Sequence, residues 1–156
     1  MKHLLIIFHS QSGRNQSLAL ALLTSAQRNP SISVRLLDAF EATSTDWLWA
    51  DAFILCTPEN FAAISGGMKQ FLDRVFYPIL KAQEQGAHQA KPYFLIVDTG
   101  NDGSQCELQL HKILKGMSAK PVQDTVFIYG VPEESDYQLM ASLGEGFSEA
   151  LALGIF

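Results

Sequence analysis

Residues 4–15, LLIIFHSQSGRN, join five consecutive apolar residues to a polar loop that contains a single glycine. An apolar run without alternation is typical of a strand that is buried on both faces, as in a parallel sheet covered by helices. The following residues, 15–27, place Leu18, Leu22 and Ala26 at intervals of four, which predicts an amphipathic helix. A strand, a polar loop and a helix in this order predict the first unit of an α/β fold.

The same alternation continues to the end of the chain. Apolar runs predict further strands at 33–37, 52–56, 93–97 and 125–129. The first of these, at 33–37, is half polar and suits a sheet edge. Apolar residues at helical spacing predict helices at 45–49, 65–80, 105–117 and 136–153. Pro78 is expected to end the helix at 65–80, and Gly144 and Gly146 weaken the pattern of the last helix. Strict alternation predicts an α/β domain with a parallel sheet and right-handed crossovers, spanning residues 1–156 without a linker.

Composition excludes several classes of protein. The 156 residues are 47% apolar and 17% charged, which is typical of a folded domain with its own core. A net charge of −5 argues against a nucleic-acid partner, because such binding requires a concentrated basic face. No apolar run is long enough to span a membrane and the N-terminus carries no cleavage site, so we expect no membrane association and a cytoplasmic location. Cys56 and Cys106 have no metal-binding or CxxC spacing and are expected to be free thiols.

The loop after the first strand is a candidate phosphate site. Ligands of such sheets bind beyond the carboxyl ends of the strands, where helix N-termini present free N–H groups and a favourable dipole to an anion. Ser10, Ser12 and Asn15 add side-chain donors, and Gly13 lets the backbone approach closely. The alternative is an ordinary helix cap. The loop contains neither GxxxxGK[ST] nor GxGxxG, so a P-loop nucleotidase and a dinucleotide Rossmann domain are not supported.

Two further loops follow the third and fourth predicted strands. The loop at 57–69, TPENFAAISGGMK, begins with a rigid Pro58 and continues with small residues, which suits a loop lying under a flat ring. Phe61 either contacts such a ring or turns into the core. The loop at 98–104, DTGNDGS, has two glycines, and its composition is equally typical of an ordinary turn.

These loops resemble those of the flavodoxin-like superfamily. The superfamily's phosphate-loop pattern, [ST]-x-[ST]-G-x-[TN], is met by Ser10, Ser12, Gly13 and Asn15. Residues 57–74, TPENFAAISGGMKQFLDR, resemble the flavin loop and following helix of its NAD(P)H-dependent FMN or quinone reductase branch. The resemblance implies a three-layer α/β/α sandwich with a five-stranded parallel sheet of order 2-1-3-4-5 and an FMN at its switch point.

Carried over residue by residue, the resemblance implies a set of cofactor-binding positions on all three loops. These are Ser10, Gln11, Ser12, Gly13, Arg14, Asn15 and Gln16 around the phosphate, Thr57 beside the ribityl chain, Pro58, Glu59, Asn60 and Phe61 along the isoalloxazine, and Thr99, Gly100, Asn101 and Gly103 on its other side. The chain departs from the pattern at Gln11 and Arg14, which are not the usual small or neutral residues. It also lacks the Trp and Tyr between which carrier flavodoxins hold the ring.

The resemblance favours an oxidoreductase in which NADPH or NADH reduces bound FMN, which then reduces a quinone, a flavin or another small acceptor. The first alternative is a flavodoxin that carries single electrons between redox proteins, and the second is a non-redox module. The flavin carries the chemistry in the first two cases, so no catalytic side chain and no metal ligand are expected. Relatives of the reductase type often pair, and a homodimer contact is one use for Trp47, Trp49 and the face formed by Phe71, Phe76 and Tyr77.

Four further residues have simpler structural interpretations. Trp47 and Trp49 are expected to pack a short helix on the sheet, and His9 to be a hydrogen-bonded structural residue. Cys56 is expected to be a small buried apolar residue. A C-x5-R phosphatase is excluded because Ala62 stands at the arginine position, and a receiver domain because the first strand ends without acidic residues.

Overall fold

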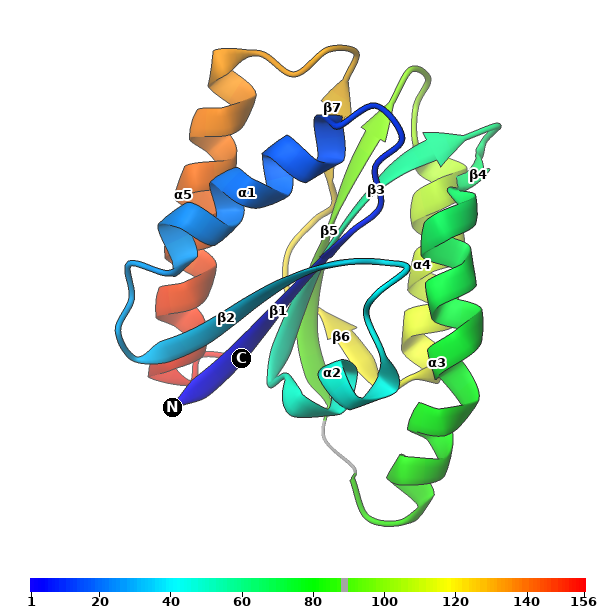
Figure 1. Cartoon of the computed structure of the whole chain (residues 1–156), viewed down its shortest axis with the longest axis vertical. Coiled ribbons are helices and arrows are strands. Elements are labelled where there is room, and N and C mark those ends of the chain that lie inside the picture. The colour runs from blue at the N-terminus through cyan, green and yellow to red at the C-terminus, as the bar shows by residue number, and fades with distance from the viewer. Residues whose placement is uncertain (88–89) are drawn as a thin grey trace.

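The computed structural model describes residues 1–87 and 90–156, which form a twisted parallel sheet with helices on both faces (Figure 1). The strands are β1 (Lys2–Phe8), β2 (Ile32–Asp38), β3 (Ala52–Asn60), β4 (Ala63–Ile64), β5 (Lys91–Thr99), β6 (Ala119–Pro121) and β7 (Val126–Tyr129). The helices are α1 (Arg14–Ala26), α2 (Ser44–Trp49), α3 (Gly66–Glu84), α4 (Ser104–Gly116) and α5 (Glu134–Leu153). The main path of the sheet is β2-β1-β3-β5-β6, with all its pairings parallel.

This path confirms the expected order 2-1-3-4-5, but the count of five strands is wrong. The fifth position is occupied by two short strands: β6 pairs with the start of β5 and β7 pairs with its end. Pro121 lacks an N–H, and the chain leaves the ladder there before it returns at Val126. The other additional strand is β4. It forms because the chain continues past the end of the sheet in β3 and then folds back, so that β4 pairs with β3 as an antiparallel hairpin.

Two apolar cores hold the three layers together, one on each face of the sheet. Alternate residues of β1 point to opposite faces, because side chains along a strand have a period of two. Leu5 and Ile7 pack with α2, α3 and α4, whereas Leu4 and Ile6 pack with α1 and α5. Figure 1 shows the same division, with α1 and α5 together on one side of the sheet and α3 and α4 on the other.

The helix α3 is longer than the sequence predicts, whereas α5 confirms the predicted last helix. Pro78 does not end α3, which continues to Glu84, because one missing hydrogen bond is tolerated in a helix anchored on either side by buried Val75 and Ile79. The last helix, α5, is continuous through both glycines. Gly144 is required there by close packing, since a Cβ atom would lie 2.2 Å from Ser25 Oγ on α1 and 2.5 Å from the Leu22 carbonyl oxygen. Across the described residues, no helix has the length and apolar character needed to cross a bilayer.

Candidate functional site

The loop between β1 and α1 presents an uncapped helix N-terminus at the carboxyl edge of the sheet. Gly13 precedes the helix with a φ of 87°, a left-handed conformation that glycine adopts without strain. No side chain caps α1 and its first turn contains no acidic residue, so its first amide groups are open to an anion. An ordinary side-chain cap, the alternative interpretation of this loop, is therefore absent from the structure.

The second predicted loop is largely strand, because β3 extends to Asn60 instead of ending at Cys56. The pairing of β1 with β3 ends at Phe8 and Cys56, while β5 remains paired with β3 as far as Pro58 and Asp98. Pro58 is compatible with this strand because its side toward β1 has no partner that would need an N–H. Thr57 is fully buried, and its hydroxyl lies 2.8 Å from the Ser65 hydroxyl at the start of α3.

The hairpin of β3 and β4 turns through Phe61 and Ala62, which have φ angles of 54° and 56°. Two consecutive positive φ angles in a two-residue connection are typical of a type I′ turn, which normally contains Asn and Gly. An aromatic residue in this conformation is strained. The Phe61 side chain is 103% exposed, so it neither turns into the core nor lines a cavity.

The third loop begins after Thr99, because β5 also extends two residues further than predicted. The Thr99 hydroxyl accepts a hydrogen bond from the Asn101 backbone N–H at 2.9 Å, and the Asn101 side-chain amide donates to Glu59 Oε1 at 3.5 Å. This contact joins the third loop to β3. Gly103 is the N-terminal cap of α4 with a φ of 74°, and Phe127 lies so close to it that a Cβ atom would clash.

The three segments meet around one cavity of about 210 Å³, which we call the edge cavity. Half of the sixteen predicted cofactor residues line it: Gln11, Ser12, Arg14, Asn15, Pro58, Glu59, Asn60 and Gly100. The segments are also bonded to one another, since Asn60 Nδ2 donates to Gln11 Oε1 at 2.8 Å. Ser10, Gly13 and Gln16 line a separate groove on the other side of the first loop. Thr57, Phe61, Thr99, Asn101 and Gly103 line neither space.

Asp98 also lines the edge cavity, and the sequence analysis did not single it out. It is 8% exposed and accepts a hydrogen bond from Asn15 Nδ2 at 3.4 Å. Burial raises the pKa of the Asp98 carboxyl, an effect that nearby Arg14 and the bond from Asn15 partly oppose. The signal was present in the sequence, because an acidic residue that directly follows a run as apolar as YFLIV is unusual unless its side chain is used.

Several buried polar atoms around the first loop and the edge cavity have no hydrogen-bond partner among the residues that the structure describes. They are His9 Nδ1, Ser10 Oγ, Asn15 Oδ1 and Glu59 Oε2. Buried polar groups are normally paired, so their gathering at one edge of the sheet points to groups that a ligand or water completes. Arg14 adds a positive charge beside the cavity, with its guanidinium 3.4 Å from the Gly130 carbonyl oxygen.

The residues interpreted as structural lie away from the edge cavity. Trp47 is fully buried against Phe53, and Trp49 stacks on His3. Cys56 is fully buried, which raises the pKa of its thiol well above the usual range. His9 is only partly as expected, because its backbone N–H bonds to the Cys56 carbonyl oxygen while its ring Nδ1 is unpartnered.

Most of the proposed dimer-contact face is not available on the surface. Trp47 and Phe71 are fully buried and Phe76 is half-buried, so of that face only Tyr77 is prominently exposed, at 75%. For Trp47 and Phe71 the structure favours core packing, the alternative use of these residues, because both belong to the core on one face of the sheet. The prediction of a homodimer itself is not tested by this burial.

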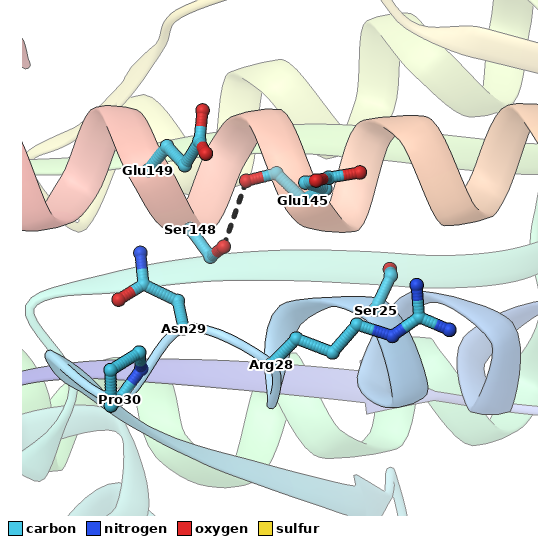
Figure 2. A pocket seen from close by; sticks show the side chains of 7 residues that line it. All are labelled: Ser25, Arg28, Asn29, Pro30, Glu145, Ser148 and Glu149. Atoms are coloured by element: carbon cyan, nitrogen blue, oxygen red, sulfur yellow. Dashed lines mark hydrogen bonds between the residues drawn. The ribbon is translucent and has the colours of Figure 1, made fainter.

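Another cavity, of about 280 Å³, lies between the end of α1 and α5 (Figure 2). It is at the opposite edge of the sheet, because α1 runs back from the carboxyl edge. Its two buried serines already bond to helix carbonyl oxygens, Ser148 to Glu145 and Ser25 to Leu22. The two buried hydroxyls of this cavity are therefore satisfied, in contrast to the buried polar atoms at the edge cavity. The described part of the chain contains no cluster of three potential metal ligands.

The sequence profile of the NADPH-dependent FMN reductase family matches residues 21–131. A flavodoxin from Aquifex aeolicus is 33% identical over 75 residues, a stretch that makes up 48% of this chain and only 40% of that flavodoxin. Both matches are stretches of sequence, and the profile match begins after the first loop.

Solved structures show the same fold over almost the whole chain. An archaeal flavodoxin superposes with a TM-score of 0.77 at 14% identity, covering 96% of this chain and 98% of that one. A flavodoxin, WrbA-like protein from Agrobacterium tumefaciens gives 0.76 at 15% identity, with 98% and 99% covered. The rubredoxin:oxygen oxidoreductase of Desulfovibrio gigas gives 0.78 at 17% identity, but this chain covers only 37% of it. These similarities confirm the predicted flavodoxin-like three-layer architecture.

Proposed function

Because the chain belongs to the NADPH-dependent FMN reductase family, we propose that it binds one FMN at the carboxyl edge of its sheet and works as an oxidoreductase. The observation that carries the proposal is the edge cavity, where three separate segments meet at an uncapped helix N-terminus. Bound FMN supplies the redox chemistry by accepting and releasing electrons, and the protein supplies placement and electrostatics.

The first loop holds the phosphate in this proposal. The open amides at the start of α1 point toward the anion, and the helix dipole favours its charge. Ser10 and Ser12 donate through their hydroxyls, Asn15 through its amide, and Arg14 contributes a positive charge. The fit is supported by the unpartnered Ser10 Oγ and by the lack of any acidic residue in the first turn of α1.

The flavin ring lies against β3 and the third loop. Pro58 and Gly100 offer a flat surface, and Asn60 offers an amide to the polar edge of the ring. The unpartnered Glu59 Oε2 is an acceptor for the single ring N–H of the isoalloxazine. Four further predicted residues support these groups without lining the cavity, because their contacts fix β3, the third loop and the start of α4. They are Thr57, Thr99, Asn101 and Gly103.

The reaction that we propose is reduction of the bound flavin by NADPH or NADH, followed by reduction of a quinone, a free flavin or another small acceptor. A single observation favours this reaction over simple electron transfer between proteins. The described lining of the edge cavity includes no aromatic ring, so a ring bound there keeps an open face for a second substrate. The alternative is a one-electron carrier that docks with redox proteins. The similarity of the fold to flavodoxin structures is compatible with this alternative.

A titration followed by visible absorption and flavin fluorescence tests the proposal. The protein is titrated with FMN, and NADPH or NADH is then added without oxygen to the same cuvette. Tight binding followed by rapid loss of the flavin absorption is the expected result. Tight binding without reduction by either nucleotide would favour the carrier, and no binding would overturn the proposal.

The double variant S12A/N15A tests the phosphate assignment. It is expected to weaken FMN binding by at least about tenfold, since two hydrogen bonds to a charged group are lost. The control is S104A, whose hydroxyl bonds only Asp102 at the start of another helix. Equal FMN affinity in S12A/N15A and the wild-type protein would contradict the role of the first loop.

A further inference from the structure

A second space adjoins the phosphate loop on the side away from the edge cavity. This groove of about 700 Å³ lies between the first loop and the loop that follows β2, and we call it the β2 groove. Ser10, Gly13 and Gln16 form one wall, and Asp38 and Phe40 form the other. Phe8 and Leu36 add apolar surface between the two walls. The proposed FMN site uses Ser10 of this wall for the phosphate and leaves the rest of the β2 groove without a function.

The wall formed by residues 38–42 is held firmly from behind. Arg74 of α3 donates to the carbonyl oxygens of Ala42 at 2.7 Å and Ala39 at 2.8 Å, and lies 3.4 Å from that of Phe40. Asp38 Oδ1 accepts the Phe40 N–H at 2.8 Å, which closes the turn. A loop fixed in this way presents the same surface before and after a ligand binds.

Phe40 is the aromatic group on this wall. It is 59% exposed, although one edge is held by the buried His9 ring at a centroid distance of 5.4 Å. His9 in turn lies against Gly67, where any Cβ atom would collide with the imidazole. Phe40 is therefore an exposed aromatic ring with a fixed position, a feature that suits stacking with a flat heterocycle.

The order of the strands determines which part of a bound ligand can contact the Phe40 ring. The proposed flavin ring lies at β3 and β5, the phosphate at the loop after β1, and the β2 groove at the end of β2. Neighbouring strands are about 4.8 Å apart, so each step along this edge is about the size of one nucleotide unit or less. A ligand that continues beyond the flavin phosphate enters the β2 groove directly.

We propose that the β2 groove binds the adenosine part of a dinucleotide, with the base stacked on Phe40 and the ribose hydroxyls facing Asp38. The proposal rests on the proposed function, because the phosphate loop must hold the neighbouring phosphate. The dinucleotide is either FAD, bound in place of FMN, or the nicotinamide nucleotide that reduces FMN. Asp38 and Glu41 place two carboxylates in this groove, so a ribose with a free 2′-hydroxyl is accepted and a 2′-phosphate is disfavoured.

The first experiment compares FAD with FMN by fluorescence titration of the flavin-free protein. FAD is expected to bind about tenfold tighter, which is at the lower end of the effect of one base–aromatic stack. F40A is expected to remove this advantage and to leave FMN affinity unchanged. The matched control is Y77A, an exposed aromatic residue on the outside of α3.

The second experiment identifies the source of the adenosine. FMN-saturated protein is titrated with NAD⁺ and with NADP⁺ in a calorimeter. If the nicotinamide nucleotide is the occupant, both are expected to bind, NAD⁺ more tightly than NADP⁺, and F40A is expected to weaken this binding. D38N keeps an oxygen to accept the Phe40 N–H, and it is expected to improve NADP⁺ relative to NAD⁺ about threefold. FMN binding with neither an FAD advantage nor an F40A-sensitive NAD⁺ affinity would overturn this inference alone. Failure to bind any flavin would overturn the proposed function as well.

Discussion

The loop 38–42 and the hairpin 59–64 lie at the same edge of the sheet, and each exposes one phenylalanine. The loop is fixed by Arg74 and Asp38, and its Phe40 rests on a buried histidine. The hairpin has only two paired positions, and Phe61 stands at its tip with a strained backbone. The difference shows that exposure of an aromatic residue does not by itself define its role, because one ring is already in place and the other can still move.

Strain at the hairpin tip has a functional interpretation. Backbone strain persists where the surrounding structure or a ligand compensates for it. Phe61 was predicted to line the flavin ring, and its fully exposed position next to the edge cavity leaves that prediction open. A small change in the turn would bring the ring over a bound ligand, whereas no comparable freedom exists at Phe40.

Of the changes proposed here, removal of the Arg74 side chain that supports the loop 38–42 is expected to have the largest effect on the free energy of unfolding. R74A loses the two short bonds to loop carbonyl oxygens, and it is expected to lower the free energy of unfolding by about 2 kcal/mol. Chemical denaturation measures the change. R35A is the control, since Arg35 makes an exposed ion pair with Asp46 at 3.1 Å that is worth less than about 1 kcal/mol. Similar effects of the two variants would show that the loop is not specially supported.

Relieving the strain of the hairpin is expected to act in the opposite direction. A62G places a residue that tolerates positive φ at a position with a φ of 56°, so it is expected to stabilise the protein by about 1 kcal/mol. A63G, one residue further into β4, is the matched control and is expected to destabilise it by about 0.5 to 1 kcal/mol. A destabilising A62G would mean that the tip is not strained.

The charge of the Asp98 carboxylate in the edge cavity can be tested through its effects on stability and on FMN affinity. Its pKa is raised by burial, so its proton is bound more strongly in the folded chain than in the unfolded one. Its contribution to stability therefore increases as the pH falls through the folded pKa toward the unfolded value of about 3.9. An ionised Asp98 also repels the proposed phosphate, and D98N is expected to bind FMN about threefold tighter at pH 8.

The advantage of D98N in FMN affinity is expected to shrink as the pH falls from 8, because Asp98 of the wild-type protein takes up its proton at a raised pKa. Affinities measured for both proteins across this range check the prediction. The titration of the FMN phosphate itself affects both proteins alike and cancels in their ratio. A ratio that is independent of pH would contradict a charged Asp98 beside the phosphate.

The smallest effect on stability is expected at Phe61. F61A removes a side chain that is 103% exposed, so it is expected to change the free energy of unfolding by less than about 0.5 kcal/mol. If Phe61 covers the flavin, the same variant weakens FMN binding. F40A, in contrast, is expected to leave the FMN affinity unchanged. Thermal unfolding and FMN titration of the two variants separate the two regions.

The sequence was sufficient to predict the features that depend on local patterns. The apolar runs located β1, β2, β3 and β5 of the main sheet path and the short strand β7, but not β6. The first loop was found because Ser10, Ser12 and Gly13 closely follow β1. All five helices were located, with ends that differ by at most four residues. These features depend on neighbours within a few positions, and those are visible in a linear sequence.

Features that depend on strand pairing were not predicted. The extension of β3 to Asn60 arises because β5 stays paired with it after β1 has ended, and neither fact is written in residues 57–60 themselves. The division of the last strand position likewise depends on β5. Asp98 carries a local signal, because it directly follows the apolar run YFLIV, but its contact with Asn15, 83 positions away, is not visible in the linear sequence. The rigid loop at 38–42 depends on Arg74, which lies 32 positions after Ala42.

The divided fifth strand position also bears on how the molecule behaves at high concentration. An exposed strand edge offers unpaired backbone groups to other chains, and short edges that carry lysine or proline resist this kind of association. The β6 edge is three residues long, with Lys120 and Pro121 among them, and the chain then leaves the sheet before the four residues of β7. The opposite edge, β2, is a continuous seven-residue strand with Arg35 as its only basic residue. Edge-to-edge aggregation of this protein, where it occurs, therefore starts from β2.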